Sequence, residues 1–142
     1  MHGSGNNGNK NIEKTVNDIL KSRAKSRIYI YLLRKNGARA DQIIRGTKLH
    51  PSTVRETLAK MYRQKLIYRK KIKNDAIGKN PYMYYSIPPI ELLRRYTDEI
   101  EERLNRLASL AFKDADSEDY RPIKINIHVG ADRRWTLDHW RH

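Results

Sequence analysis

Four side chains within a short polar segment could form specific hydrogen bonds: Ser52, Thr53, Arg55 and Glu56. A guanidinium group can donate two parallel hydrogen bonds, as it does to O6 and N7 of guanine, and a carboxylate can accept one from the amino group of cytosine. Hydroxyl groups bond to either kind of base. These residue types therefore predict recognition of base edges, if one helix face presents them to a duplex.

Glu56 is a carboxylate among many cations, and it would repel phosphate groups. Contact with a base edge would explain its presence. An intramolecular ion pair with Arg55, Lys60 or Arg63 would explain it equally well. Both interpretations remain open on the sequence alone.

A second set of side chains carries only positive charge and suits the phosphate backbone of DNA, which fixes the register of a bound protein. We expect backbone contacts from Arg45, Lys48, Lys60, Arg63, Arg69, Lys70 and Lys71. Lys73 and Lys79 fall at the expected tip of a hairpin, where they could reach a minor groove.

The positive charge is concentrated in one part of the chain. The 142 residues carry a formal net charge of +14, yet residues 1–88 contain 20 Lys and Arg against 5 Asp and Glu, and residues 89–142 contain 10 against 11. Such a balance predicts a polyanionic partner. It also indicates a basic binding region joined to a neutral remainder.

Several classes of protein are excluded or disfavoured. The absence of cysteine excludes disulfides, thiolate catalysis and cysteine-ligated zinc. No apolar run approaches the roughly 20 residues of a membrane span, so we expect a soluble cytoplasmic protein associated with the nucleoid. No catalytic triad, phosphate-binding glycine loop or His-x-x-x-His helix is present, and we expect no enzyme and no cofactor. Nothing fixes the geometry of His128, His139 and His142, so we predict no metal site.

The elements that would position these side chains can be predicted from periodicity and capping residues. Residues 1–10 are rich in Gly and Asn and suggest a flexible arm, and Asn11 can cap a helix that ends near Ser22. Ser26 suggests the cap of a helix over residues 27–35, which Gly37 would end, and a short helix follows over residues 40–45. Leu49 would pin the next turn into the core.

The segment from His50 to Lys65 has the pattern of a recognition helix. Pro51 suits the first helical position, and His50 or Ser52 can cap it. Val54, Leu58 and Met61 form one apolar stripe, which leaves the polar residues on the other side. Together with the preceding short helix and its turn, this segment predicts a helix-turn-helix.

A β-hairpin should follow the recognition helix. Residues 66–73 and 81–87 are rich in β-forming residues and flank a polar tip at residues 74–80. Basic residues on a hairpin can serve only to prevent edge-to-edge aggregation. Directly after a helix-turn-helix, however, a basic hairpin is better interpreted as a wing that contacts phosphates.

The stretch SRIYIYLLRKNGARADQIIRGTKLHPSTVRETLAKMYRQKLIYRKK, residues 26–71, resembles the winged helix-turn-helix of archaeal transcription regulators. YMYYSIPPIELL, residues 82–93, is similar to the way TrmB-type regulators leave the wing and enter their long helix. The resemblance spans residues 26–111 and implies a double-stranded DNA-binding regulator that dimerises. Sugar sensing is not implied, because the remaining chain is too short for the effector domain of full-length members.

After Pro88 and Pro89, seven residues repeat at alternating spacings of three and four, as in the a and d positions of a coiled coil. They are Ile90, Leu93, Thr97, Ile100, Leu104, Leu107 and Ala111. We expect this helix to join two copies into a homodimer, although it could instead pack on its own domain. The remaining segment, residues 112–142, contains an acidic loop, a period-2 strand from Ile123 to Val129 and a tail with Trp135 and Trp140.

The sequence thus predicts a mainly α fold with a small β-wing, in which a winged helix-turn-helix precedes a long coiled-coil dimerisation helix. Its expected parts are an arm (1–10), a DNA-binding domain (11–88), a dimerisation helix (89–111) and the tail (112–142). The predicted function is sequence-specific regulation of transcription by a homodimer on double-stranded DNA. The two Trp residues could cover the end of the coiled coil or contact the basal transcription machinery.

Two other functions remain open on the sequence. An architectural chromatin protein would coat DNA with little sequence specificity and a steep salt dependence. An RNA-binding winged helix would bind RNA at least as well as DNA, although an A-form major groove is too narrow for a recognition helix.

Overall fold

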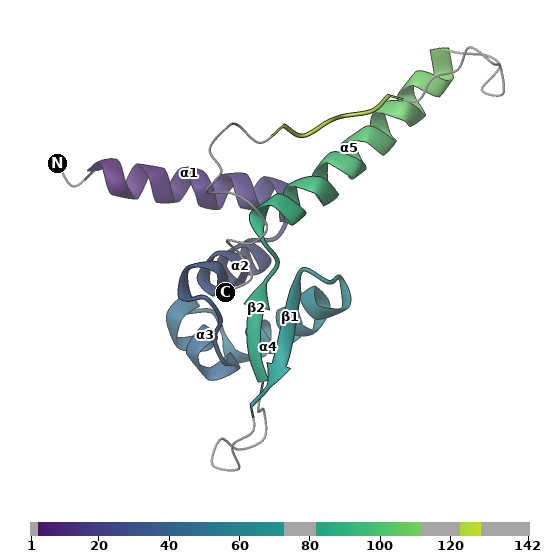
Figure 1. Cartoon of the computed structure of the whole chain (residues 1–142). Coiled ribbons are helices and arrows are strands. Elements are labelled where there is room, and N and C mark those ends of the chain that lie inside the picture. The colour runs from purple at the N-terminus through teal and green to yellow at the C-terminus, as the bar shows by residue number, and fades with distance from the viewer. Residues whose placement is uncertain (1–2, 73–81, 112–122, 129–142) are drawn as a thin grey trace. The chain divides into compact units, whose positions relative to one another are not determined.

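The computed structural model describes residues 3–72, 82–111 and 123–128, without the side chains of residues 3–7 and 9 (Figure 1). These residues form five helices and a two-stranded sheet. The elements are α1 (Gly3–Leu20), α2 (Arg23–Lys35), α3 (Ala40–Thr47), α4 (Pro51–Arg63), β1 (Ile67–Lys71), β2 (Tyr82–Ser86) and α5 (Pro89–Ala111). The chain divides into two units, Met1–Ile87 and Pro88–His142.

The core of the first unit forms around α2. Ile28, Tyr29 and Leu32 are almost fully buried, as are Ile43 of α3 and Met61 of α4. Burial of each such side chain contributes roughly 1.5–3 kcal/mol relative to exposure. The polar group of Tyr29 is also satisfied, because its hydroxyl donates a 2.8 Å hydrogen bond to the Ile87 carbonyl. The helical core therefore also holds the end of the hairpin.

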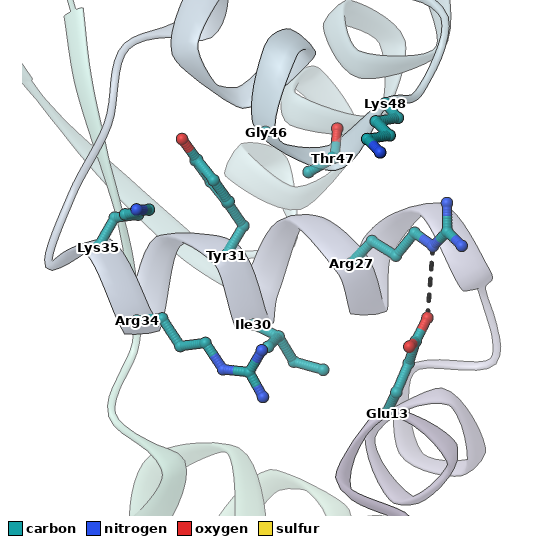
Figure 2. Close-up of a pocket in the computed structure, with 9 residues that line it drawn as sticks. All are labelled: Glu13, Arg27, Ile30, Tyr31, Arg34, Lys35, Gly46, Thr47 and Lys48. Carbon is teal, nitrogen blue, oxygen red and sulfur yellow. Dashed lines mark hydrogen bonds and ion pairs between the residues drawn. The ribbon is translucent and has the colours of Figure 1, made fainter. Parts of the chain in front are cut away.

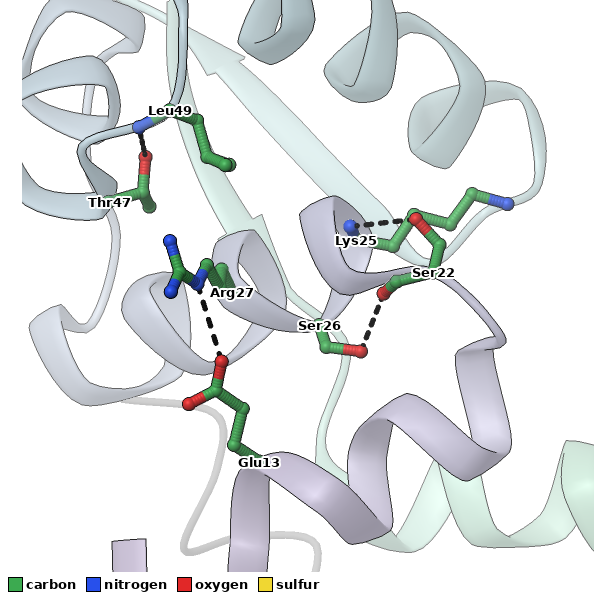
Figure 3. Close-up of polar contacts among 7 residues, drawn as sticks. All are labelled: Glu13, Ser22, Lys25, Ser26, Arg27, Thr47 and Leu49. Carbon is green, nitrogen blue, oxygen red and sulfur yellow. Dashed lines mark hydrogen bonds and ion pairs between the residues drawn. The ribbon is translucent and has the colours of Figure 1, made fainter. Parts of the chain in front are cut away.

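The junction between α1 and α2 differs from the prediction in its cap. Ser22, not Ser26, caps α2, because the Ser22 hydroxyl accepts a hydrogen bond from the Lys25 amide (Figure 3). Ser26 is fully buried inside the helix, and its hydroxyl donates to the Ser22 carbonyl at 2.7 Å. An ion pair between Glu13 of α1 and Arg27 of α2 also spans this junction (Figure 2).

Helix α1 begins earlier than predicted. It extends to Gly3 and so includes most of the segment expected to be a flexible arm. The reason is that adding a residue to an existing helix costs far less than nucleating one. The better helix-forming residues after Asn11, with Val16 buried, provide that nucleus.

The helix-turn-helix is confirmed. Helix α3 extends two residues beyond the predicted Arg45, and Lys48 ends it with a φ of 59°. His50 caps α4 by accepting a hydrogen bond from the Ser52 amide, and Pro51 occupies the first turn as predicted. Val54, Leu58 and Met61 are buried, which confirms the apolar stripe of α4. Leu49 is only half-buried in the turn.

The hairpin forms with shorter strands than predicted. Strands β1 and β2 are antiparallel, and Ile67 pairs with Ser86 while Lys71 pairs with Tyr82. Ala38, between α2 and α3, adds a bridge by exchanging two backbone hydrogen bonds with Tyr84. The predicted tip, with Lys73 and Lys79, lies outside the described residues. The hairpin is thus attached to the helix-turn-helix through backbone hydrogen bonds at Ala38.

In the second unit, α5 has the predicted bounds and leaves part of its apolar stripe exposed. Leu93, Leu104 and Leu107 are 43%, 37% and 65% exposed, and Leu92 is the buried side chain of the helix. Ile90, Thr97 and Ile100 are half-buried, and Ala111 is exposed. The coiled coil itself stays a prediction.

The predicted strand does not form over residues 123–128, which instead lie along α5 (Figure 1). The Ile123 amide donates to the side-chain oxygen of Asn105, and the Asn105 side chain donates back to the Ile123 carbonyl. The Ile125 amide donates to Glu101. A strand needs a neighbouring ladder for its backbone groups, and here side chains of α5 take that role. Val129, the acidic loop and both Trp residues lie outside the described residues.

Candidate nucleic-acid interface

The exposed face of α4 carries the side chains predicted to contact bases. Ser52, Arg55 and Glu56 are exposed, whereas Thr53 is half-buried. The Ser52 hydroxyl lies 2.8 Å from Nδ1 of His50, so it already takes part in the helix cap. Arg55 and Glu56 therefore have the chemistry and the exposure that recognition of a partner requires.

The structure bears on the two interpretations of Glu56. Within the described part of the chain, no ion pair joins Glu56 to Arg55, Lys60 or Arg63. Both Glu56 and Arg55 are exposed without a charged partner there. The intramolecular ion pair that would explain Glu56 is thus absent from this structure, although Lys60 lies four residues away on the same helix.

The cations that were predicted to contact phosphates differ in their charged partners. Lys48, Lys60 and Arg63 are exposed. Arg45 forms a 3.0 Å ion pair with Asp41, in which the two side chains are 73% and 58% exposed. An exposed pair of this kind contributes at most about 1 kcal/mol, so a phosphate could replace Asp41 at little cost.

Arg69 of β1 is held between two aromatic rings. Its guanidinium carbon lies 4.1 Å from the ring centroid of Tyr62, at the end of α4, and 4.3 Å from that of Tyr82 in β2. Both distances are well inside the range of cation–π contacts. The Arg69 side chain therefore links α4 to the hairpin, and it also carries a positive charge.

Two other tyrosines stack on the hairpin. The rings of Tyr68 and Tyr85 lie 5.2 Å apart and nearly parallel, and the Lys70 ammonium lies 5.4 Å from the centroid of Tyr85. Partial burial raises the pKa of Tyr68, and the neighbouring Tyr85 raises it further. Both effects favour the neutral form of Tyr68, which suits a stacked pair.

Among the described residues, sequence reasoning missed the aromatic contacts of the hairpin and Tyr62. The signal was the run Tyr82, Tyr84 and Tyr85 opposite the basic residues of β1, but the pairing register was needed to interpret it. Lys70 and Lys71 are exposed on β1 as expected.

In the parts of the chain that the structure covers, no group of three or more His, Asp or Glu side chains could hold a metal ion. His139 and His142, two of the three histidines considered and not predicted as metal ligands, lie outside those parts. None of the described helices is long and apolar enough to cross a membrane.

A solved structure shares the fold, although comparisons of the sequence itself found nothing. No family model matches the chain, and no curated protein matches it. A possible transcriptional regulator from Methanosarcina mazei Go1 is similar over 72% of this chain and 88% of its own, with a TM-score of 0.60 and 17% sequence identity. A point mutant of S. aureus MepR aligns over 75% of this chain and 77% of its own, with a TM-score of 0.45 and 17% sequence identity. The helix-turn-helix and its hairpin, with the first of these likenesses, identify the fold as a winged helix-turn-helix.

Proposed function

We propose that this chain is a transcription regulator that binds specific sequences of double-stranded DNA as a homodimer. The observation that carries this proposal is the exposed face of α4, where Arg55 and Glu56 have no charged partner among the described residues. In a winged helix this face enters the major groove, where such a pair can distinguish bases. The resemblance of residues 26–71 and 82–93 further suggests the TrmB-type regulators of archaea.

The charge of the surrounding surface supports the same function. Lys48, Lys60 and Arg63 are exposed cations on the turn and on α4. Each phosphate that they neutralise would release counterions and add affinity that does not depend on sequence. Thr53 and Ser52 are weaker candidates for base contacts, because the first is half-buried and the second belongs to the cap.

The homodimer is proposed from α5. Leu104 and Leu107 lie on the predicted a and d positions, and both side chains are exposed to solvent in a single chain. Apolar side chains at these spacings bury one another when two helices associate. A C2 dimer would present two recognition helices to two half-sites, about one helical turn or a multiple of it apart.

Selection of bound genomic fragments, followed by titration of single fragments, tests base recognition. We expect a compact palindromic motif, and we expect Arg55→Ala or Glu56→Ala to weaken binding to it by about tenfold or more, because a base contact is worth roughly 1–3 kcal/mol. The matched controls are Arg106→Ala and Glu102→Ala, which change the same residue types at exposed positions of α5.

The opposite outcomes identify the alternative functions. Enrichment without a motif, a steep salt dependence and no effect of Arg55→Ala or Glu56→Ala would indicate an architectural protein. Equal or tighter binding to double-stranded RNA would indicate an RNA-binding winged helix.

Sedimentation of the free protein tests the dimer independently. Leu107→Lys should convert a dimer to a monomer, since it buries a charge in the interface. Leu110→Lys is the control, because Leu110 is 81% exposed and lies outside the predicted a and d positions. A dimer that survives Leu107→Lys would contradict the coiled coil.

A further inference from the structure

A pocket of about 390 Å³ lies in the first unit, between α1, α2 and the end of α3 (Figure 2). This volume lies in the range of sites that bind small organic molecules. One face of α2 supplies Arg27, Ile30, Tyr31, Arg34 and Lys35 to its lining. The residues proposed to contact bases do not line it, so the proposed function leaves this pocket unexplained.

The lining carries more positive than negative charge. Arg27, Lys35 and Lys48 line the pocket together with one carboxylate, that of Glu13. The C-terminal ends of α2 and α3 also lie at the pocket, and each adds roughly half a negative charge. These three cations therefore leave an excess of about one positive charge, which favours an organic anion.

Several polar groups in the pocket are available to a ligand. Arg27 meets Glu13 only through Nε, at 3.3 Å, and in both close-up views its guanidinium lies between Glu13 and the end of α3 (Figures 2 and 3). Within the described residues, the Tyr31 hydroxyl and the ammonium groups of Lys35 and Lys48 make no hydrogen bond. By contrast, the Thr47 hydroxyl already donates to Ile43 and accepts from Leu49.

The shape of the pocket depends on a glycine. Tyr31 extends from α2 toward Gly46 of α3 (Figure 2), and a Cβ atom on Gly46 would overlap the Tyr31 ring and lie 2.7 Å from its hydroxyl. Any larger residue at this position would therefore displace the ring. Glycine thus lets the aromatic ring form one wall, with Ile30 as a second apolar surface.

We propose that this pocket binds a small organic anion, either a phosphate monoester or a dicarboxylate. Lys35, Lys48 and the two terminal nitrogens of Arg27 contact its charged groups, and Tyr31 contacts its uncharged part. Charge-assisted hydrogen bonds to such groups are the strong ones in proteins. These contacts come from α2 and from the end of α3, so the site exists only in the folded domain.

The same proposal gives the ligand an effect on DNA, and this part rests on the proposed function. Lys48 lies in the turn two residues before the cap of α4, and it is one of the side chains proposed to contact phosphates. An anion that holds the Lys48 ammonium competes with the DNA backbone for it. By linkage, the ligand lowers the affinity for DNA by the same factor as DNA lowers the affinity for the ligand.

Amide chemical shifts in NMR spectra of the DNA-free protein test the binding site. Glycerol 3-phosphate and malate are the two probes, each titrated at constant ionic strength against sodium chloride. We expect shifts at Tyr31, Gly46 and Thr47, and the probe that produces them distinguishes phosphate from carboxylate chemistry. Lys35→Gln should weaken binding about tenfold, because it removes a charge-assisted hydrogen bond.

Lys60→Gln is the matched control, since it removes the same charge from the exposed face of α4. Equal weakening by Lys60→Gln, shifts centred on α4, or no shift with either probe at millimolar concentration would overturn the site. Tyr31→Phe provides a variant without a charge change, and it should weaken binding while leaving the spectrum of the remaining core intact.

A DNA titration with and without the bound probe tests the effect on affinity. The probe should weaken DNA binding by wild-type protein and should have no effect on Lys48→Gln. Pocket binding that leaves wild-type DNA affinity unchanged would overturn the competition but not the site. Failure of the protein to select any DNA would instead contradict the proposed function, with the NMR result unaffected.

Discussion

At the scale of single residues, backbone conformation and close approach make particular side chains necessary. Gly37 has a φ of +104°, and a Cβ atom there would overlap the ring of Tyr85. Gly37 is adjacent to Ala38, whose hydrogen bonds to Tyr84 attach the hairpin to the helix-turn-helix. Two independent constraints therefore act on one glycine at the point where the wing meets the helices.

Gly37→Ala should lower the free energy of unfolding by roughly 1–3 kcal/mol, because it combines an unfavourable φ with a steric clash. Urea unfolding monitored by circular dichroism measures the change. Gly8→Ala is the control, since nothing lies within 4 Å of a Cβ atom at Gly8 in α1. There the substitution should be neutral or stabilising by up to about 1 kcal/mol. Equal effects of the two substitutions would contradict the role of Gly37.

At the scale of elements, the side chain of Arg69 links the hairpin to α4. Arg69 stacks between Tyr62 of α4 and Tyr82 of β2, while its backbone pairs with Tyr84. An Arg69 side chain engaged in this way is less available to a phosphate than Lys70 or Lys71. We therefore expect Arg69 to act mainly by positioning the hairpin, and only weakly by contacting phosphate.

A double-mutant cycle tests this contact. Tyr62→Ala and Arg69→Ala should show a coupling of about 0.5–1 kcal/mol in the free energy of unfolding, as for other exposed cation–π pairs. The control cycle pairs Tyr62→Ala with Arg63→Ala, because Arg63 is an exposed neighbour in the sequence without a ring contact in the described structure. A coupling no larger than that of the control would show that the stacked arrangement does not contribute to stability.

The elements also explain how much could be predicted from the sequence. Helices α4 and α5 were predicted well because their signals are local: Pro51 and Pro89 mark their starts, and apolar periodicity marks their faces. The prediction of Ser26 as the cap of α2 was wrong, because the helix begins earlier and burial makes Ser26 an interior residue.

Contacts between elements distant in sequence could not be predicted. The stack on Arg69 requires the strand register, and the pocket requires α1, α2 and α3 to meet. Residues 123–128 alternate as a strand does, but Asn105 and Glu101 of α5 bind their backbone instead. A pattern of period 2 specifies a conformation, whereas the partner that satisfies its hydrogen bonds is decided by the fold.

At the scale of the whole molecule, the chain consists of a basic part and a nearly neutral part. Residues 1–88 carry all of the excess positive charge, whereas α5 mixes both signs. Two copies of α5 can therefore approach without strong repulsion, although two basic units would repel each other. Binding of DNA would neutralise that repulsion, so dimer formation and DNA binding should reinforce each other.

The salt dependence of DNA affinity can count the contacts that such a dimer makes. Each phosphate contact contributes about 0.9 to the slope of the logarithm of affinity against the logarithm of salt concentration. In a dimer, Lys60→Ala removes one contact from each of two chains, so the slope should become shallower by about 1.8. Arg106→Ala on α5 should leave the slope unchanged, since its exposed guanidinium belongs to the neutral unit.

The comparison should use one selected operator and a protein concentration at which sedimentation reports a dimer. A change of about 0.9 would mean that only one protomer contacts phosphate through Lys60, as in an asymmetric complex or a bound monomer. An unchanged slope would mean that Lys60 does not contact the backbone at all. Repeating the titration with the monomeric Leu107→Lys variant separates an asymmetric dimer from a bound monomer. If the wild-type protein binds as a dimer, halving the number of recognition helices should about halve the slope. If it binds as a monomer, the slope should stay the same.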